Sequence, residues 1–298
     1  MRKILVLCVL LLAACWLGAA EKIDWRRART VAKGIQVLEQ ELESPRLMKV
    51  HWMRVDLTTP GLRFSSTGRD PDWGKPMPDY TNGVIAIRSR RETTANFVRT
   101  QRLQGRKMVA GFNSAPWRPW CSPWNHKWAD PAGLNLADGV VVSDHGKPTN
   151  PLFVAWKDGR CEIRETLPTN LYAQVAVAHT GFGLLMRKGK FTAYAQDARD
   201  STVLHPRMAY GLSSDGRWLY VLAVDGRQKG WSLGANLYDL AVLLESAGAG
   251  DAINMDGGGS TTLLYWNDKG KTVEYLNRHD AGRRHWRTNA LNIGIYFE

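Results

Sequence analysis

Short apolar runs separated by glycine-containing turns dominate the chain. A polar residue followed by glycine stands between Val, Ile, Leu or aromatic residues at four places: Asp158-Gly159, Asp215-Gly216, His145-Gly146 and Lys188-Gly189. Such steps are typical of β-hairpins, because glycine adopts the backbone conformation that tight turns need. The pattern predicts a strand-rich protein of the α+β class with few helices.

Two segments have helical periodicity instead. Residues 88–104 are polar with a narrow apolar stripe, and residues 236–247 carry a broader one that is followed by Gly248, a common helix stop. We expect a helix in each segment.

The last hundred residues predict a particular strand arrangement. Residues 217–224 are apolar on both faces, as in a buried strand, and a second short apolar run covers residues 252–255 beyond the helix. Strand, helix and strand in this order are typical of a right-handed βαβ crossover with parallel strands. We therefore expect a mixed sheet with this crossover near the C-terminus. Asp225 and Asp256 would then lie at one edge of the sheet, where such folds bind ligands.

A glycine run follows the second of these strands, in the segment N-M-D-G-G-G-S-T-T-L-L-Y (residues 254–265). No lysine precedes its hydroxyl residues, which excludes a Walker loop, and Thr262 stands where a dinucleotide fingerprint or a serine elbow needs glycine. Two interpretations remain, a tight bend between strands or a backbone cradle for an anion. The cradle would use the N–H groups of the glycines and two hydroxyls, that is Gly257, Gly258, Gly259, Ser260 and Thr261.

The net charge of +12 favours an anionic partner such as a phosphate compound, a nucleic acid or an envelope polymer. The basic residues are spread along the whole chain, and no concentrated basic stripe accompanies a known nucleic-acid-binding motif. We therefore expect no nucleic-acid partner.

Residues 1–20 have the pattern of an export signal peptide: Arg2 and Lys3, an apolar stretch over residues 4–12, and the small residues Gly18, Ala19 and Ala20 before the expected cleavage site. The protein would then be periplasmic or extracellular, with no transmembrane segment after signal removal. A competing interpretation is a lipoprotein box ending in Cys15.

Signal cleavage would leave two cysteines, Cys121 and Cys161. In an oxidising compartment they could form a disulfide, but two free buried thiols fit the sequence equally well.

Four motifs occur in a fixed order: H-P-R-M-A-Y-G (residues 205–211), V-D-G-R (224–227), S-L-G-A-N-L-Y-D-L-A (232–241) and D-A-I-N-M-D-G-G-G-S-T (251–261). Together they resemble the phosphodiester glycosidase family, and weaker matches extend the resemblance over residues 105–298. Residues 21–104 would be an N-terminal part of the same domain or a small lead-in layer.

The resemblance implies hydrolysis of the bond between a sugar and a phosphate ester, in a small molecule or a glycopolymer such as an envelope or extracellular polysaccharide. Such chemistry uses a carboxylate beside the sugar and positive charge beside the phosphate. Asp256 (nucleophile or base) and Asp225 (general acid) are the catalytic candidates, Arg207 would bind phosphate, and Asn113 would bind sugar. No cofactor is implied, and no ligand spacing demands a metal, although a divalent cation is compatible with the chemistry.

Each candidate also has a purely structural interpretation. Either aspartate could cap a turn, Arg207 could form a surface salt bridge, and Asn113 could be a turn residue. A non-catalytic protein that binds carbohydrate or exopolysaccharide in the same pocket is the alternative function.

Residues 116–128 depart from the family pattern, because they contain four tryptophans and three prolines. This loop could form an aromatic wall for sugar rings, or it could simply be packed onto the core.

Overall fold

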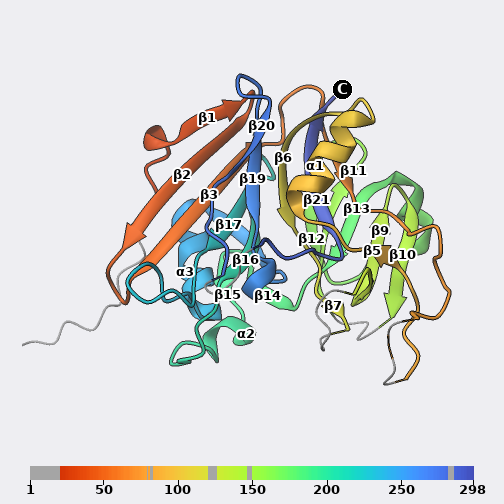
Figure 1. The fold of residues 1–298 in the computed structure, drawn as a ribbon. Coiled ribbons are helices and arrows are strands. Elements are labelled where there is room, and N and C mark those ends of the chain that lie inside the picture. The colour runs from red at the N-terminus through yellow and green to blue at the C-terminus, as the bar shows by residue number, and fades with distance from the viewer. Residues whose placement is uncertain (1–20, 79, 81–82, 120–125, 146–149, 281–284) are drawn as a thin grey trace, which may run out of the picture.

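The computed structural model describes residues 21–78, 80, 83–119, 126–145, 150–280 and 285–298. The expected signal peptide, Cys15, Cys121 and part of the tryptophan-rich loop lie outside these residues. Strands predominate in the described part of the chain, and three larger sheets surround a common core (Figure 1).

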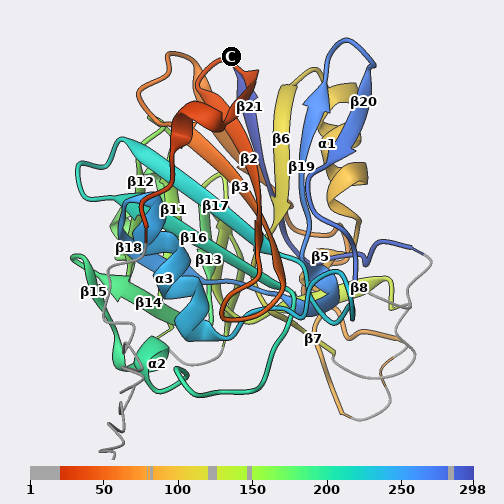
Figure 2. The ribbon, with the colours of Figure 1, turned by 90° about the vertical axis from the view of Figure 1, so that its left-hand side faces the viewer.

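The largest sheet contains eight strands, and the glycine run follows one of its central strands. In spatial order the strands are β1 (Arg29–Ala32), β2 (Ile35–Leu42), β3 (Met48–Asp56), β17 (Trp218–Val224), β16 (Arg207–Ser213), β18 (Ala249–Asn254), β14 (Gly183–Arg187) and β15 (Lys190–Phe191). Helices α2 (Ala193–Gln196) and α3 (Leu237–Ala247) pack on its outer face (Figure 2).

Two five-stranded sheets and one small sheet complete the fold. The first consists of β10 (Val140–His145), β9 (Gly133–Ala137), β13 (Val175–Thr180), β11 (Leu152–Trp156) and β12 (Cys161–Arg164). The second consists of β20 (Thr272–Tyr275), β19 (Leu263–Asn267), β6 (Lys107–Asn113), β21 (Asn292–Phe297) and β4 (Leu62–Ser66), and α1 (Thr94–Leu103) packs against it. The small sheet consists of β5 (Ser89–Arg90), β8 (Trp128–Pro131) and β7 (Trp117–Arg118).

The described residues also form three short 3-10 helices: η1 (Trp25–Arg27) before β1, and η2 (Thr169–Gln174) and η3 (Gly258–Ser260) between strands. The last of them contains most of the glycine run.

The main core lies where the three larger sheets meet. Tyr210 of β16 is fully buried there, and its ring makes edge contacts with Phe112 of β6 and Phe153 of β11 at centroid distances of 5.2 and 5.1 Å. These contacts join the three sheets in the core.

The N-terminal residues contribute strands to the same sheets as the rest of the chain. β3 pairs with β17 over residues 50–56, and β4 pairs with β21. Residues 29–66 are therefore integrated into the layers that carry the C-terminal motifs.

The helix expected at residues 236–247 is confirmed as α3. Asn236 and Asp239 form a capping box at its start, and Gly248 ends it with φ of 101°. The other expected helix is shorter than residues 88–104, because Ser89 and Arg90 form a strand and Thr93 caps α1.

The expected mixed sheet is wrong, since all strand pairs of the described residues are antiparallel. The βαβ crossover is not found in its predicted form either. β16 forms a hairpin with β17 through Asp215-Gly216 and fills the position between β17 and β18. β17 and β18 run in the same direction only because each is antiparallel to β16.

The turns at Asp158-Gly159, Asp215-Gly216 and Lys188-Gly189 join paired antiparallel strands, as expected. The hairpin expected at His145-Gly146 falls partly outside the described residues, since Gly146 is not among them. β10, which ends at His145, is an edge strand that pairs with β9 and not with the next strand, β11. The turn that joins β9 to β10 is Asp138-Gly139, where both residues have positive φ.

Candidate functional site

The glycine run is a compact loop that packs on the start of β16. A Cβ atom on Gly257 would lie 2.8 Å from the carbonyl oxygen of Pro206, and Gly258 has φ of +59°. Both positions therefore require glycine for steric or conformational reasons. The loop is a tight bend whose backbone packs closely against Pro206 and Arg207.

One of the glycine N–H groups predicted to bind a ligand, that of Gly258, and two neighbouring N–H groups of the loop are already used within the protein. Gly258 donates to the carbonyl of Pro206 at 2.8 Å, while Ser260 and Thr261 donate to the carbonyls of Gly257 and Gly258. A full backbone cradle is therefore not available in this conformation.

Asp256, which begins this loop, carries the most unusual carboxyl group of the site. It is 3% exposed, and burial raises its pKa to about 7. The Ser260 hydroxyl, the charge of Arg287, the Gly257 N–H and the Trp117 indole oppose this rise. Oδ2 of Asp256 has no hydrogen-bond partner among the described residues. A buried carboxyl group that titrates near neutrality is suited to proton transfer.

A buried polar network fixes the backbone of Asp256. Asn113 at the end of β6 donates from Nδ2 to the carbonyl of Asp256 at 2.7 Å, and its Oδ1 accepts the N–H of Thr262 at 2.9 Å. Tyr210 donates its hydroxyl to the carbonyl of Asn113 at 2.6 Å. Because Asn113 uses both polar ends of its side chain within the protein, the expected sugar contact has no structural support.

A second part of this network lies on β13. The N–H of Asp256 donates to the carbonyl of Ser114 at 2.9 Å, and the Ser114 hydroxyl is 2.8 Å from Nδ1 of His179. Burial lowers the pKa of His179 to about 3, so the imidazole is neutral at physiological pH. His179 thus supports Ser114 without adding charge beside Asp256.

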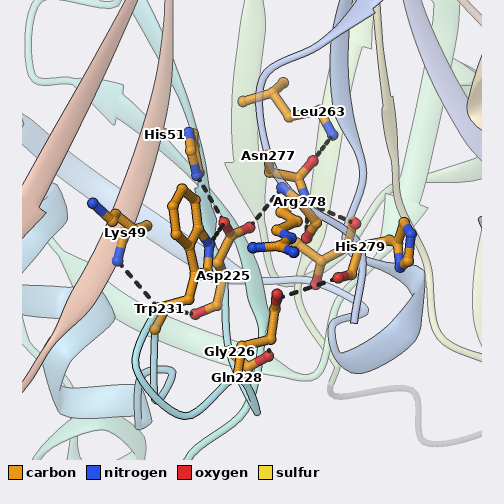
Figure 3. Close-up of polar contacts among 12 residues, drawn as sticks. Lys49, His51, Asp225, Gly226, Gln228, Trp231, Leu263, Asn277, Arg278 and His279 are labelled. Atoms are coloured by element: carbon orange, nitrogen blue, oxygen red, sulfur yellow. Dashed lines mark hydrogen bonds and ion pairs between the residues drawn. The ribbon is translucent and has the colours of Figure 1, made fainter. Parts of the chain in front are cut away.

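Asp225 lies in a different environment, which Figure 3 shows. Its side chain is fully buried; Oδ1 accepts the backbone N–H of Arg278 at 2.9 Å, and Oδ2 accepts Nε1 of Trp231 at 2.8 Å. Oδ2 is also 3.2 Å from Nε2 of His51 on β3. Both oxygens are therefore occupied, and Asp225 joins β3, the loop after β17 and the segment after β20.

The two aspartates follow the parallel-running β17 and β18, which β16 separates by about 10 Å, twice the usual spacing between strands. The structure thus places them at one edge of the sheet but in unlike surroundings. Asp225 has the partners of a structural residue, whereas Oδ2 of Asp256 has no hydrogen-bond partner in the described part of the chain.

Three arginines surround the glycine loop. Arg207 donates from Nε to the carbonyl of Ala235 at 3.1 Å, and burial lowers its pKa. Arg227 lies against Gly258 and is paired with Asp280 at 3.1 Å. Nη1 of Arg287 is 3.5 Å from the Ser260 hydroxyl. The loop therefore lies in a strongly cationic environment.

Sequence reasoning missed Arg287, His179, Ser114 and Tyr210 as parts of this site. The positive charge of Arg287 lowers the pKa of the Asp256 carboxyl group. From the sequence, Arg207 was expected to bind phosphate, and Arg287 had no expected role. The residues come from distant parts of the chain, so spacing could not reveal their proximity. The signals available were the family motif at residues 205–211, which contains Tyr210, and the weaker resemblance over residues 105–298, which includes Arg287.

The tryptophan-rich loop is packed onto the protein where it is described. Trp117 is buried near Asp256, and the guanidinium of Arg91 lies 4.3 Å from its ring centre. Trp120 and Trp124 lie outside the described residues.

Cys161 is a free, buried thiol, and burial raises its pKa. The described residues contain no cluster of three or more His, Cys, Asp or Glu side chains that could hold a metal ion. They also include no helix of the length and apolar character needed to cross a membrane.

Comparison with known proteins gives a consistent result. The sequence profile of the phosphodiester glycosidase family matches residues 103–296. The chain is 30% identical over 259 residues to the SPbeta prophage-derived uncharacterized protein YomE of Bacillus subtilis strain 168, a match that covers 81% of this chain and 39% of YomE. The chain thus spans about two fifths of that relative.

Solved structures share the fold at low sequence identity. The catalytic domain of zebrafish N-acetylglucosamine-1-phosphodiester alpha-N-acetylglucosaminidase, auto-inhibited by its pro-peptide, has a TM-score of 0.60 at 20% identity, over 94% of this chain and 87% of that one. A hypothetical protein from Synechocystis has a TM-score of 0.62 at 13% identity, over 91% of this chain and 63% of that one.

Proposed function

The chain belongs to the phosphodiester glycosidase family, and we propose on that basis that it hydrolyses the glycosyl–phosphate bond of a sugar-1-phosphodiester. The products are the free sugar and a phosphate monoester. We further propose that the protein is exported and that its substrate is part of an envelope or extracellular polysaccharide. The pattern of residues 1–20 and the net charge of +12 support this setting.

The observation that carries the proposed reaction is the buried carboxyl group of Asp256, whose pKa is about 7. In its ionised form it acts as the base: it accepts a proton from water as the water oxygen forms a bond to the anomeric carbon. The bond from that carbon to the phosphate oxygen breaks, and the phosphate leaves with the bonding electrons. A base with a pKa near the working pH is the most effective for this step.

Positive charge assists departure of the phosphate. Arg207 lies beside Gly257 and Arg287 beside Ser260, and a guanidinium binds phosphate oxygens through paired, charge-assisted hydrogen bonds. A phosphate ester is a good leaving group, so the reaction needs little help from a general acid. We accordingly assign Asp225 a bracing role rather than the acid role.

Substitution Asp256→Asn tests this proposal against a non-catalytic, carbohydrate-binding function. A panel of methyl α-glycosyl phosphodiesters of common sugars is offered to wild type and variant, and free sugar and ligand binding are both measured. Hydrolysis by the wild type, together with binding but no hydrolysis by the variant, supports the enzyme. Binding by both proteins without hydrolysis of any member of the panel supports the binding protein.

A further inference from the structure

Tyr194 has a ring that is held in place yet remains open to solvent. Its hydroxyl accepts Nδ2 of Asn254 at 3.0 Å, and a Cβ atom at Gly183 would lie 2.7–2.9 Å from three carbons of the ring. The ring therefore rests on a backbone that only glycine leaves open to it, although 36% of the residue is exposed. A rigid aromatic surface of this kind loses little entropy when a ligand packs on it.

The neighbouring Arg207 is a cation without a carboxylate partner. Its guanidinium is largely withdrawn from water, and in the described parts of the chain no ion pair involves it. Asn254, which donates to the Tyr194 hydroxyl, is paired with Ala209, two residues beyond Arg207 on β16. A half-buried, unpaired guanidinium is complemented best by an anionic ligand.

The positions of these residues define an order along the site. Asn254 precedes Asp256 by two residues, and a Cβ on Gly257 would lie 3.4 Å from the Cα of Arg207. The Asp256 carboxyl group interacts with Arg287, and Asn254 holds the Tyr194 hydroxyl. Arg207 on β16 thus lies close to the loop that begins at Asp256 and to Asn254, the residue that holds the Tyr194 ring.

We propose that Tyr194 is a specificity-determining residue that packs against the aglycone, the group esterified to the substrate's phosphate, while Arg207 binds that phosphate. This inference rests on the proposed function. It adds a binding subsite for the aglycone, on the side of the phosphate away from the sugar. It favours an aglycone with a ring or an apolar face.

Two substrates that differ only in the aglycone test the inference. The methyl and benzyl phosphodiesters of one α-glycosyl phosphate, with the sugar that the wild type cleaves, are compared for wild type, Tyr194→Phe and Tyr194→Leu. Leucine keeps an apolar contact with Gly183 but removes the aromatic ring. We expect Tyr194→Leu to raise KM for the benzyl ester about fivefold, to leave KM for the methyl ester within about twofold, and Tyr194→Phe to resemble the wild type.

Tyr238→Leu is the matched control, because Tyr238 lies on the same outer face and its hydroxyl accepts a hydrogen bond from Arg199. It should change neither KM. Equal effects of Tyr194→Leu on both esters, or none on either, overturn the inference while the proposed function stands.

Binding of benzyl phosphate and methyl phosphate, which are products rather than substrates, separates the two proposals. Tighter binding of benzyl phosphate by the wild type, lost in Tyr194→Leu, supports the subsite even if no diester is cleaved. Equal binding of the two phosphates by the wild type overturns the subsite.

Discussion

The Nδ2 group of Asn113 donates to the carbonyl oxygen of Asp256 across 2.7 Å, which joins the end of β6 to the loop after β18. The same side chain accepts the N–H of Thr262, so one amide closes both ends of the glycine loop. The orientation of the Asp256 carboxyl group therefore depends on a residue 143 positions earlier in the chain.

Asn113→Ala should weaken both the fold and the reaction. It leaves a buried carbonyl and a buried N–H without partners, which costs about 2–4 kcal/mol of unfolding free energy. Urea unfolding measures this loss, and kcat on the preferred diester should fall at least about tenfold because the Asp256 loop loosens. Asn96→Ala, at an exposed position of α1, is the control and should change neither value. A stable but inactive Asn113→Ala protein would instead indicate direct substrate contact.

The pH dependence of activity and of stability should both report Asp256. As a base, its carboxyl group must be ionised, so kcat/KM should rise with pH through about 7. Its pKa in the fold is above the ordinary value of 3.8, so the folded protein binds more protons than the unfolded chain between these values. The resulting stability is fully present below about pH 4 and is lost as pH rises through about 7.

In Asp256→Asn this decline of stability, on the order of 2–4 kcal/mol between pH 4 and 8, should be absent. Urea unfolding at several pH values measures it. Identical pH profiles of stability for variant and wild type would contradict the raised pKa.

Arg287→Gln should move the pH profile without abolishing the reaction. The positive charge lowers the pKa of Asp256, so its loss should shift the rising limb of kcat/KM to higher pH by about one unit. Arg99→Gln removes the same charge from an exposed position of α1 and should leave the profile in place. A shift to lower pH would show that Arg287 does not act through Asp256.

Asp225→Asn should act mainly on stability. The asparagine places an N–H donor where the carboxylate accepts hydrogen bonds from Arg278, Trp231 and His51, so donor faces donor. We expect the free energy of unfolding in urea to fall by about 2–4 kcal/mol. The kcat of the folded variant should fall less than about tenfold. The exposed Asp268→Asn is the control. A large loss of kcat at unchanged stability would indicate that Asp225 is a catalytic residue after all.

Gly257→Ala should disrupt the loop, because its Cβ would meet the Pro206 carbonyl oxygen at 2.8 Å and the backbone would have to shift. We expect about 1–3 kcal/mol of destabilisation and a lower kcat. Gly68→Ala is a matched control, since no atom lies within 4 Å of its Cβ position. Equal thermal unfolding of the two variants would refute the close packing of the loop.

Local chemistry in the sequence was sufficient for the elements whose signals are local. The capping residues and the stop of α3, three of the four glycine turns and the strand-rich class follow from neighbouring residues, whose steric and hydrogen-bonding preferences do not depend on the rest of the fold. The proposal of Asp256 as a catalytic residue likewise began from an aspartate before consecutive glycines and from the family motifs.

Only the tertiary structure decided what surrounds those residues. The insertion of β16 between β17 and β18, the pairing of Asp225 with His51 and the approach of Arg287 to Asp256 all join segments far apart in the chain. Strand order depends on the free energy of the whole core, and the pKa of a carboxyl group depends on burial and nearby charge. For this reason two aspartates with the same Asp-Gly signature differ. Both carboxyl oxygens of Asp225 have hydrogen-bond partners within the protein, whereas the Asp256 carboxyl group is buried and has a pKa of about 7.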